Sequence, residues 1–159
     1  MGQKIPEIKI LEIPKLKQLR FYCGIACLSM ASSYFGRTLE QEVLAEKYFT
    51  KGKFIEGAGV SLLEILGAAR KIGLNAKMKY GFCDDDIIKS INDDSPIIAL
   101  AASDKYLMWN HFYLIKGYDT SGFIYINDPG DLRKNKFKYA EFRKLWDYRN
   151  NCAGVSVSK

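Results

Sequence analysis

The chain has 159 residues, of which 48% are hydrophobic and 26% charged, and its formal net charge is +6. The length fits one domain, residues 1–159, that can bury a core without a disulfide or a metal. The longest apolar run, Pro96 to Ala102, is far too short to cross a bilayer, and the N-terminus lacks the apolar core of a signal peptide. We therefore expect a cytoplasmic protein without membrane insertion, whose four cysteines stay reduced.

The N-terminal part, from about residue 15 to 73, is predicted to be helical after a short strand at Glu7 to Ile13. Apolar residues at near-helical spacing predict a first long helix from Gly24 to Phe35, closed by Gly36. Two possible capping boxes, Thr38 with Gln41 and Ser61 with Glu64, predict the starts of two more helices. A glycine-rich loop, Thr50 to Val60, lies between them.

The C-terminal part, from about residue 74 to 159, is predicted to be mostly sheet. The turn-rich tetrad Asp119 to Gly122 separates two of its strands. The predicted strands are Leu74 to Tyr80, Pro96 to Ala102, Phe112 to Tyr118, Phe123 to Asn127 and Ala153 to Val157, and the predicted helices are Asp84 to Ile91 and Tyr139 to Tyr148. Helices followed by an antiparallel sheet define the α+β class.

The positive charge and the cysteines carry little functional information by themselves. Basic residues are scattered along the chain, which favours a solvated surface over attraction to an acidic peptide, a nucleic acid or an anionic membrane. None of the usual nucleic-acid motifs is visible, so we expect no nucleic-acid partner. Cys23 and Cys27 are four residues apart, but no second pair or histidine cluster completes a zinc site. We expect no metal.

Cys23 stands where the first long helix is predicted to begin. A helix N-terminus presents unpaired N–H groups and a partial positive charge, and both lower the pKa of a thiol, especially beside an imidazolium. Gly24 is expected to let a substrate carbonyl approach the sulfur and the amides at the helix end, which could hold an oxyanion. The alternative is that Cys23 and Cys27 are both small core residues. Cys27, one turn further along, is expected to be covered by the sheet.

His111 is the one histidine of the sequence, so any imidazole chemistry must use it. If the flanking strands pair across a two-residue turn at Asp119–Thr120, His111 lies opposite Asp128 on the same face of the sheet. Moving the turn by one residue puts Gly130 opposite and leaves Asp128 one diagonal step away. A carboxylate in either position can bond one imidazole nitrogen and leave the other for a thiol. A lone histidine is nevertheless more often structural.

Three other residues are candidates for the same site. Asn127 points to the other face in this register, and Asp119 sits in the turn, where aspartate is common for conformational reasons. Asp128 therefore ranks above both as the residue that orients the histidine. Gln18, five residues before Cys23, could donate its amide to an oxyanion. On the residues alone, a surface glutamine in a lysine-rich segment is the simpler interpretation.

Five segments carry a resemblance to a known family. They are YCGIACLSMASSYFG, GVSLLEILGAARKIGLNAK, SPIIALAA, HFYLIKGYD and YINDPG. In order and spacing they resemble the papain-like double-glycine leader peptidases, which are bacteriocin-processing domains fused to peptide exporters, and their stand-alone relatives. The resemblance covers about Gln18 to Val157. It implies the papain-like fold, in which N-terminal helices pack on a C-terminal antiparallel sheet.

The resemblance also implies roles for four residues. Cys23 is the nucleophile, His111 the base, Asp128 the third member of the triad and Gln18 the oxyanion donor. In the family this glutamine most often precedes the cysteine by six residues, whereas here the gap is five. The membrane and ATP-binding domains of the exporter-fused members lie outside the resemblance. A peptide or protein substrate is expected, and a separate peptide exporter is a partner that the resemblance allows.

These observations predict a cysteine peptidase or a related amide hydrolase. It would act through a Cys-His-Asp triad and a thioester intermediate, without a cofactor. Acyl transfer by the same triad, with an amine or thiol in place of water, is one alternative. A non-catalytic module of the same fold that only binds a peptide is the other.

Overall fold

The computed structural model describes residues 4–49 and 59–159, and in that part of the chain it contains five helices and seven strands. Most of the predicted loop Thr50 to Val60 lies outside the described residues. The helices are α1 (Cys23–Tyr34), α2 (Gln41–Tyr48), α3 (Leu62–Lys71), α4 (Asp84–Asn92) and α5 (Tyr139–Asp147). The strands are β1 (Ile8–Ile10), β2 (Asn75–Lys79), β3 (Ile97–Ala102), β4 (Asn110–Asp119), β5 (Phe123–Asn127), β6 (Lys136–Lys138) and β7 (Gly154–Ser158).

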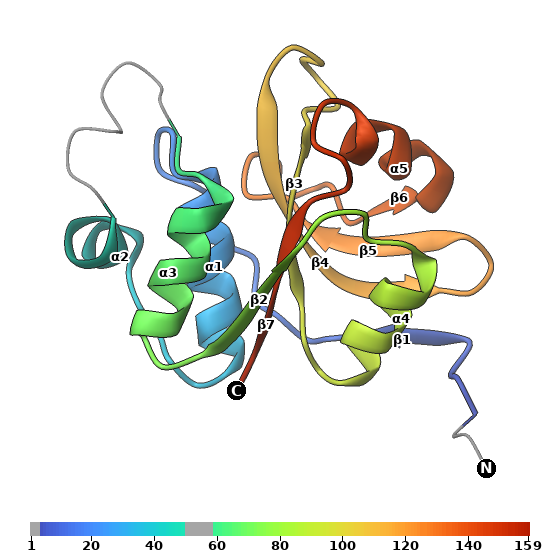
Figure 1. Cartoon of the computed structure of the whole chain (residues 1–159), viewed down its shortest axis with the longest axis horizontal. Coiled ribbons are helices and arrows are strands. Elements are labelled where there is room, and N and C mark those ends of the chain that lie inside the picture. The colour runs from blue at the N-terminus through green and yellow to red at the C-terminus, as the bar shows by residue number, and fades with distance from the viewer. Residues whose placement is uncertain (1–3, 50–58) are drawn as a thin grey trace.

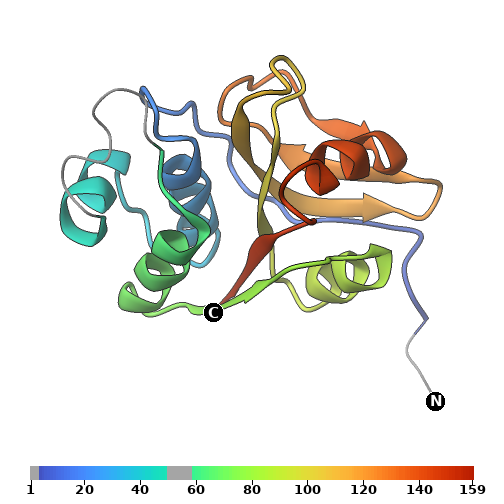
Figure 2. The ribbon, with the colours of Figure 1, turned by 45° about the horizontal axis from the view of Figure 1, so that its top comes forward.

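The strands form one antiparallel sheet in the order β2-β7-β3-β4-β5-β6. β1 pairs with the far end of β4, where Ile8 faces Asp119 and Ile10 faces Gly117. β3 covers the first part of the same edge of β4, so neighbours flank β4 along both edges. Figures 1 and 2 show α1, α2 and α3 gathered on one side of the sheet and α4 and α5 on the other. The α+β prediction is confirmed.

Helix α1 is the centre of the helical layer. Every residue from Gly24 to Ser32 is buried, because β4 covers one side of the helix while α2 and α3 cover the others. A helix that is apolar all round is typical of such a position. Its predicted bounds are correct to within one residue, and Gly36 ends it with a φ of +80°, which glycine adopts without strain.

The two predicted capping boxes have opposite outcomes. Ser61 and Glu64 form the expected box at the start of α3, with the Glu64 N–H donating to Ser61 Oγ at 3.2 Å. The box predicted for Thr38 and Gln41 is wrong. Helix α2 begins only at Gln41, its N-cap residue Glu40 makes no side-chain cap, and the buried Gln41 side chain bonds elsewhere.

The turn between β4 and β5 differs from the predicted one. The loop has three residues, Thr120 to Gly122, with Asp119 facing Phe123 and Gly122 at a φ of +113°. The register shifts between Ile115 and Gly117, which leaves a bulge at Lys116, and Leu114 then faces Asn127. If this register is continued past the ends of the two strands, Gly130 lies opposite His111. Asp128 therefore occupies the diagonal position that was the second of the two predictions.

Strand β6 was not predicted. Its three residues alternate lysine and phenylalanine, and only Phe137 faces the core. Aromatic rings pack around it under α5, with centroids 5.2 to 5.7 Å apart. These rings are Tyr113, Phe137, Phe142 and Trp146. They hold α5 against the face of the sheet from which His111 projects.

Candidate active site

Cys23 is the first residue of α1, as the sequence predicted. The first backbone bond of the helix runs from the Ala26 N–H to the Tyr22 carbonyl, at 2.7 Å. No side-chain cap bond closes this end of the helix. The chain enters the helix through Phe21, whose φ of +66° is unusual for a residue other than glycine. The half-buried thiol therefore lies against the amides of a helix N-terminus.

The side chains of His111 and Asp128 contact each other, and His111 also contacts the Cys23 sulfur. His111 is the second residue of β4, and Asp128 directly follows β5. The imidazole Nε2 lies 2.7 Å from Asp128 Oδ1, which also accepts a 2.8 Å hydrogen bond from the Gly130 N–H. The side chains of His111 and Asp128 are only 16% and 5% exposed. Because Nε2 faces the carboxylate, the second ring nitrogen is left for Cys23, and the thiol and the imidazole are hydrogen-bonded.

The pKa of Cys23 is lowered and that of His111 is raised, and each shift favours the charged form of the group. Burial on its own raises the pKa of the Cys23 thiol. The hydrogen bond and charge of His111, with the N–H groups of Phe112 and Gly24, outweigh that effect and lower it. Burial also disfavours the imidazolium, but Asp128 and Cys23 raise the pKa of His111 to about 9. Both shifts favour a thiolate beside an imidazolium over a neutral thiol beside a neutral imidazole.

Gln18 reaches the same place from the segment before α1. It lines a pocket together with His111, Asp128 and Gly130. Its backbone N–H donates to the Pro129 carbonyl at 2.9 Å, which ties it to the loop that follows Asp128. Its Oε1 atom is buried without a hydrogen-bond partner among the described residues. The structure thus brings all four predicted site residues together.

The family model of the Peptidase_C39 like family matches residues 10–153, nearly the whole chain. The chain belongs to this family. The resemblance to double-glycine leader peptidases that the sequence predicted is thereby confirmed. No curated protein matches the chain.

Solved structures place the fold of this C39-like family member among peptidases. A C39-like peptidase from Bacillus anthracis superposes with a TM-score of 0.78 at 19% identity, over 97% of this chain and 98% of the other. The double-glycine motif protease of an AMS/PCAT transporter, solved with its leader peptide, gives 0.67 at 24% identity, over 94% of each chain. The peptidase domain of Streptococcus ComA, a bifunctional ABC transporter, gives 0.66 at 17% identity, over 90% and 96%. At these identities the likeness establishes the papain-like peptidase fold.

The role expected for Gly24 is wrong. A Cβ at this position would lie 2.7 Å from Val60 Cγ2, 2.9 Å from Ile65 Cδ1 and 3.0 Å from Phe112 Cδ2. The missing side chain therefore lets α1 approach α3 and β4 in the core, away from any approaching substrate. The predictions for Cys27 and Asn127 hold. Cys27 is fully buried, and Asn127 turns from His111 to donate to the Ile13 carbonyl at 3.1 Å.

Sequence reasoning missed two residues that support the imidazole in this C39-like site. The Tyr113 ring packs edge-on against His111, with centroids 4.7 Å apart. Gly130 lies so close that a Cβ there would be 3.2 Å from His111 Cε1 and 3.2 Å from Asp128 Oδ1. Tyr113 shares the face of β4 with His111, and the Pro129–Gly130 pair follows Asp128 directly. The sequence therefore already held both features, the Tyr113 position two residues after His111 and the Pro129–Gly130 pair after Asp128.

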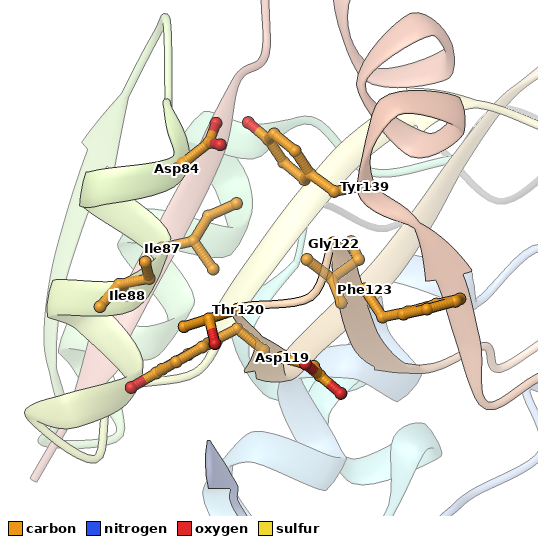
Figure 3. A pocket seen from close by; sticks show the side chains of 10 residues that line it. Asp84, Ile87, Ile88, Asp119, Thr120, Gly122, Phe123 and Tyr139 are labelled. Atoms are coloured by element: carbon orange, nitrogen blue, oxygen red, sulfur yellow. The ribbon is translucent and has the colours of Figure 1, made fainter. Parts of the chain in front are cut away.

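A second pocket lies at the opposite end of β4 and is separate from this site. Figure 3 shows Asp84, Ile87 and Ile88 of α4 on one side of it and Tyr139 on another. Its remaining wall comes from the β4–β5 hairpin, through residues 118–120 and 122–124. Eight residues of extended strand separate Asp119 from His111, which is roughly 26 Å. No group of three His, Cys, Asp or Glu side chains in the described part of the chain could hold a metal ion. No helix there is long and apolar enough to span a membrane.

Proposed function

We propose that the protein is a cysteine peptidase with a Cys23–His111–Asp128 triad. The observation that carries the proposal is the imidazole of His111, which is hydrogen-bonded to the carboxylate of Asp128 on one side and to the thiol of Cys23 on the other. A thiol at a helix N-terminus with a lowered pKa is a nucleophile, and an imidazole held by a carboxylate is a base with a fixed orientation. The same geometry favours an enzyme over a module that only binds peptides.

The reaction follows from these positions. The Cys23 sulfur adds to the carbonyl carbon of the scissile peptide, and the oxygen takes up the negative charge. The N–H of Cys23 and the side-chain amide of Gln18 stabilise that oxyanion. As the C–N bond breaks, the His111 imidazolium gives its proton to the leaving amine. His111 then takes a proton from water, which attacks the thioester, releases the carboxylate product and restores the thiol.

The leaving part of the substrate would lie over the pocket that Gln18 and His111 line. His111 is the proposed donor of the proton to the leaving amine, and because His111 lines this pocket we assign the pocket to the amine side of the scissile bond. Its outer wall is the hairpin between β3 and β4, where Tyr106 and Trp109 are 61% and 67% exposed and their ring centroids lie 5.2 Å apart. Exposed rings on an anchored hairpin suit a peptide with a large apolar side chain after the cleavage point.

The double-glycine peptidases among the structural neighbours suggest the first substrate to test. A peptide ending in Gly-Gly, joined by an amide to a fluorogenic amine, reports cleavage after the second glycine. The wild-type protein should release the fluorophore, and Cys23→Ala should not, with circular dichroism and thermal unfolding unchanged. Full activity of the Cys23→Ala variant would refute the assignment. Adding a primary amine separates the acyl-transfer alternative, since a transferase would form the new amide in place of the free acid.

A further inference from the structure

The side chain of Gln41 is an unusual feature of the helical layer. Gln41 is the first residue of α2 and is only 6% exposed. Its Oε1 accepts a hydrogen bond from the Leu19 N–H, and its Nε2 donates to the Lys17 carbonyl, both at 2.9 Å. One carboxamide thus binds the backbone on either side of Gln18, and none of its bonds goes to its own helix end, where the sequence predicted a cap.

These two bonds act together with a third to hold Gln18. In an extended chain, the carbonyl of one residue and the N–H of the residue two further on point to the same edge, and the N–H between them points to the opposite edge. Gln41 binds the first edge, through Lys17 and Leu19. The Pro129 carbonyl binds the second edge, through the Gln18 N–H at 2.9 Å. The backbone of Gln18 is therefore held from both edges, by α2 and by the loop after Asp128.

The side chain of Gln18 depends on this backbone clamp for its position. Its buried Oε1 makes no hydrogen bond to the described residues. A side-chain amide that must meet an oxyanion within hydrogen-bond distance therefore depends on its backbone to locate it. Helix α2 packs on α1, the helix that begins with Cys23. Gln41 therefore fixes the backbone of Gln18 relative to the helix that carries the proposed nucleophile.

We propose that Gln41 is a positioning residue that sets the oxyanion-binding amide of Gln18 by clamping the backbone on both of its sides. This inference rests on the proposed function of Cys23 and Gln18. Gln41 itself does not touch the reacting atoms. Its contribution should therefore appear only in steps where a carbonyl oxygen becomes negative, and only while Gln18 is present.

Two small probes separate those steps. p-Nitrophenyl acetate acylates a thiolate through a tetrahedral oxyanion, and release of p-nitrophenolate gives the rate. Iodoacetamide alkylates the same thiolate by displacement of iodide, with no charge on a carbonyl oxygen. Because Cys83 is an exposed free thiol, all variants carry Cys83→Ser, which puts a hydroxyl in place of the thiol at that N-cap position. The ratio of the acylation rate to the alkylation rate then isolates oxyanion stabilisation.

Gln41→Met keeps the length of the side chain and removes both hydrogen bonds. Gln18→Ala should lower acylation by at least about tenfold, and Gln41→Met by at least about threefold, with alkylation unchanged in both. Gln41→Glu keeps the acceptor for Leu19 and loses the donor to Lys17, so it should fall between wild type and Gln41→Met, and it serves if the methionine variant does not fold. Ser95→Ala, which removes a buried 2.7 Å bond to the Val157 carbonyl away from the site, is the matched control and should leave the ratio unchanged.

The decisive measurement is the double variant. Adding Gln41→Met to Gln18→Ala should cause no further loss of acylation, because the group that Gln41 positions is already gone. The same loss in both backgrounds, or an equal loss of alkylation, would overturn the positioning role while the proposed function stands. If neither reagent modifies Cys23 in the wild-type protein, the proposed function fails, and the inference fails with it.

Discussion

Replacing Asp128 by asparagine removes one negative charge and leaves the size of the side chain almost unchanged. The amide oxygen can still accept from the His111 imidazole and from the Gly130 N–H, which the carboxylate now binds at 2.7 and 2.8 Å. The variant therefore changes the electrostatics of the site more than its packing. It tests whether the charge of Asp128 maintains the thiolate of Cys23.

The size of the effect follows from the pKa of His111. The ordinary value is 6.5, and in the folded protein it is raised to about 9 even though burial acts in the opposite direction. That difference corresponds to about 3 kcal/mol in favour of the imidazolium. The loss of an opposite charge in direct contact lowers such a pKa by roughly 1 to 3 units. Since the ratio of thiolate–imidazolium to thiol–imidazole depends on this pKa, we expect it to fall roughly 10- to 1,000-fold.

The ion pair of Cys23 and His111 forms only between the pKa values of the two groups. In the wild type the ion pair exists from the lowered pKa of Cys23 up to about pH 9, where His111 loses its proton. In Asp128→Asn the window should narrow from both sides, so that alkylation of Cys23 rises only near the pH of an ordinary thiol.

The assay is the rate of iodoacetamide alkylation of Cys23 from roughly pH 4 to pH 10, in the Cys83→Ser background. The wild-type profile should reach its plateau at a clearly lower pH than the Asp128→Asn profile. Two superimposable profiles would refute the role of the Asp128 charge. Cys27 should stay unmodified in both proteins, because it is fully buried and burial raises its pKa well above the ordinary value.

Three further predictions test the scaffold and the proposed substrate pocket. Gly24→Ala should destabilise the protein by about 1 to 3 kcal/mol in urea unfolding, because the added Cβ has no room. Gly67→Ala, in open space within α3, should stabilise the protein by about 0.5 to 1 kcal/mol. Equal effects of the two substitutions would contradict the packing argument. Ser61→Ala should cost about 1 kcal/mol in the same assay through loss of the capping box, and an unchanged unfolding midpoint would exclude that contribution. Trp109→Ala should raise the KM for a peptide with an apolar residue after the cleavage point and leave iodoacetamide alkylation unchanged, while an unaltered KM would remove this ring from the pocket.

Local signals explain why most elements could be predicted. The spacing of apolar residues predicted α1 and α3, and alternating or continuous apolar runs predicted β3 and β5. Each of these elements buries residues whose spacing is visible in its own local sequence. β6 could not be found in this way. It is three residues long, and its one buried residue, Phe137, is defined by aromatic partners far away in the sequence.

Site residues were predictable to the extent that their chemistry is rare. A single histidine and a cysteine at a helix start leave few choices, whereas the exact strand register depends on a bulge that no local pattern announces. Gln41 shows the limit most clearly. Its sequence position fits an N-cap motif, but its side chain bonds a segment more than twenty residues earlier, and only the packing of α2 on α1 brings the two together.

The bulge at Lys116 has a consequence for engineering the chain. Between the bulge and the triad, Leu114 and Ile115 keep their own pairing with Asn127 and Ile126, and beyond it the hairpin follows a different offset. The tip at Thr120–Gly122 therefore does not dictate how the strand ends that carry His111 and Asp128 line up. An epitope tag or a reporter domain inserted at Ser121 should leave the alkylation of Cys23 unchanged, which makes this tip the natural attachment point for following the protein in cells.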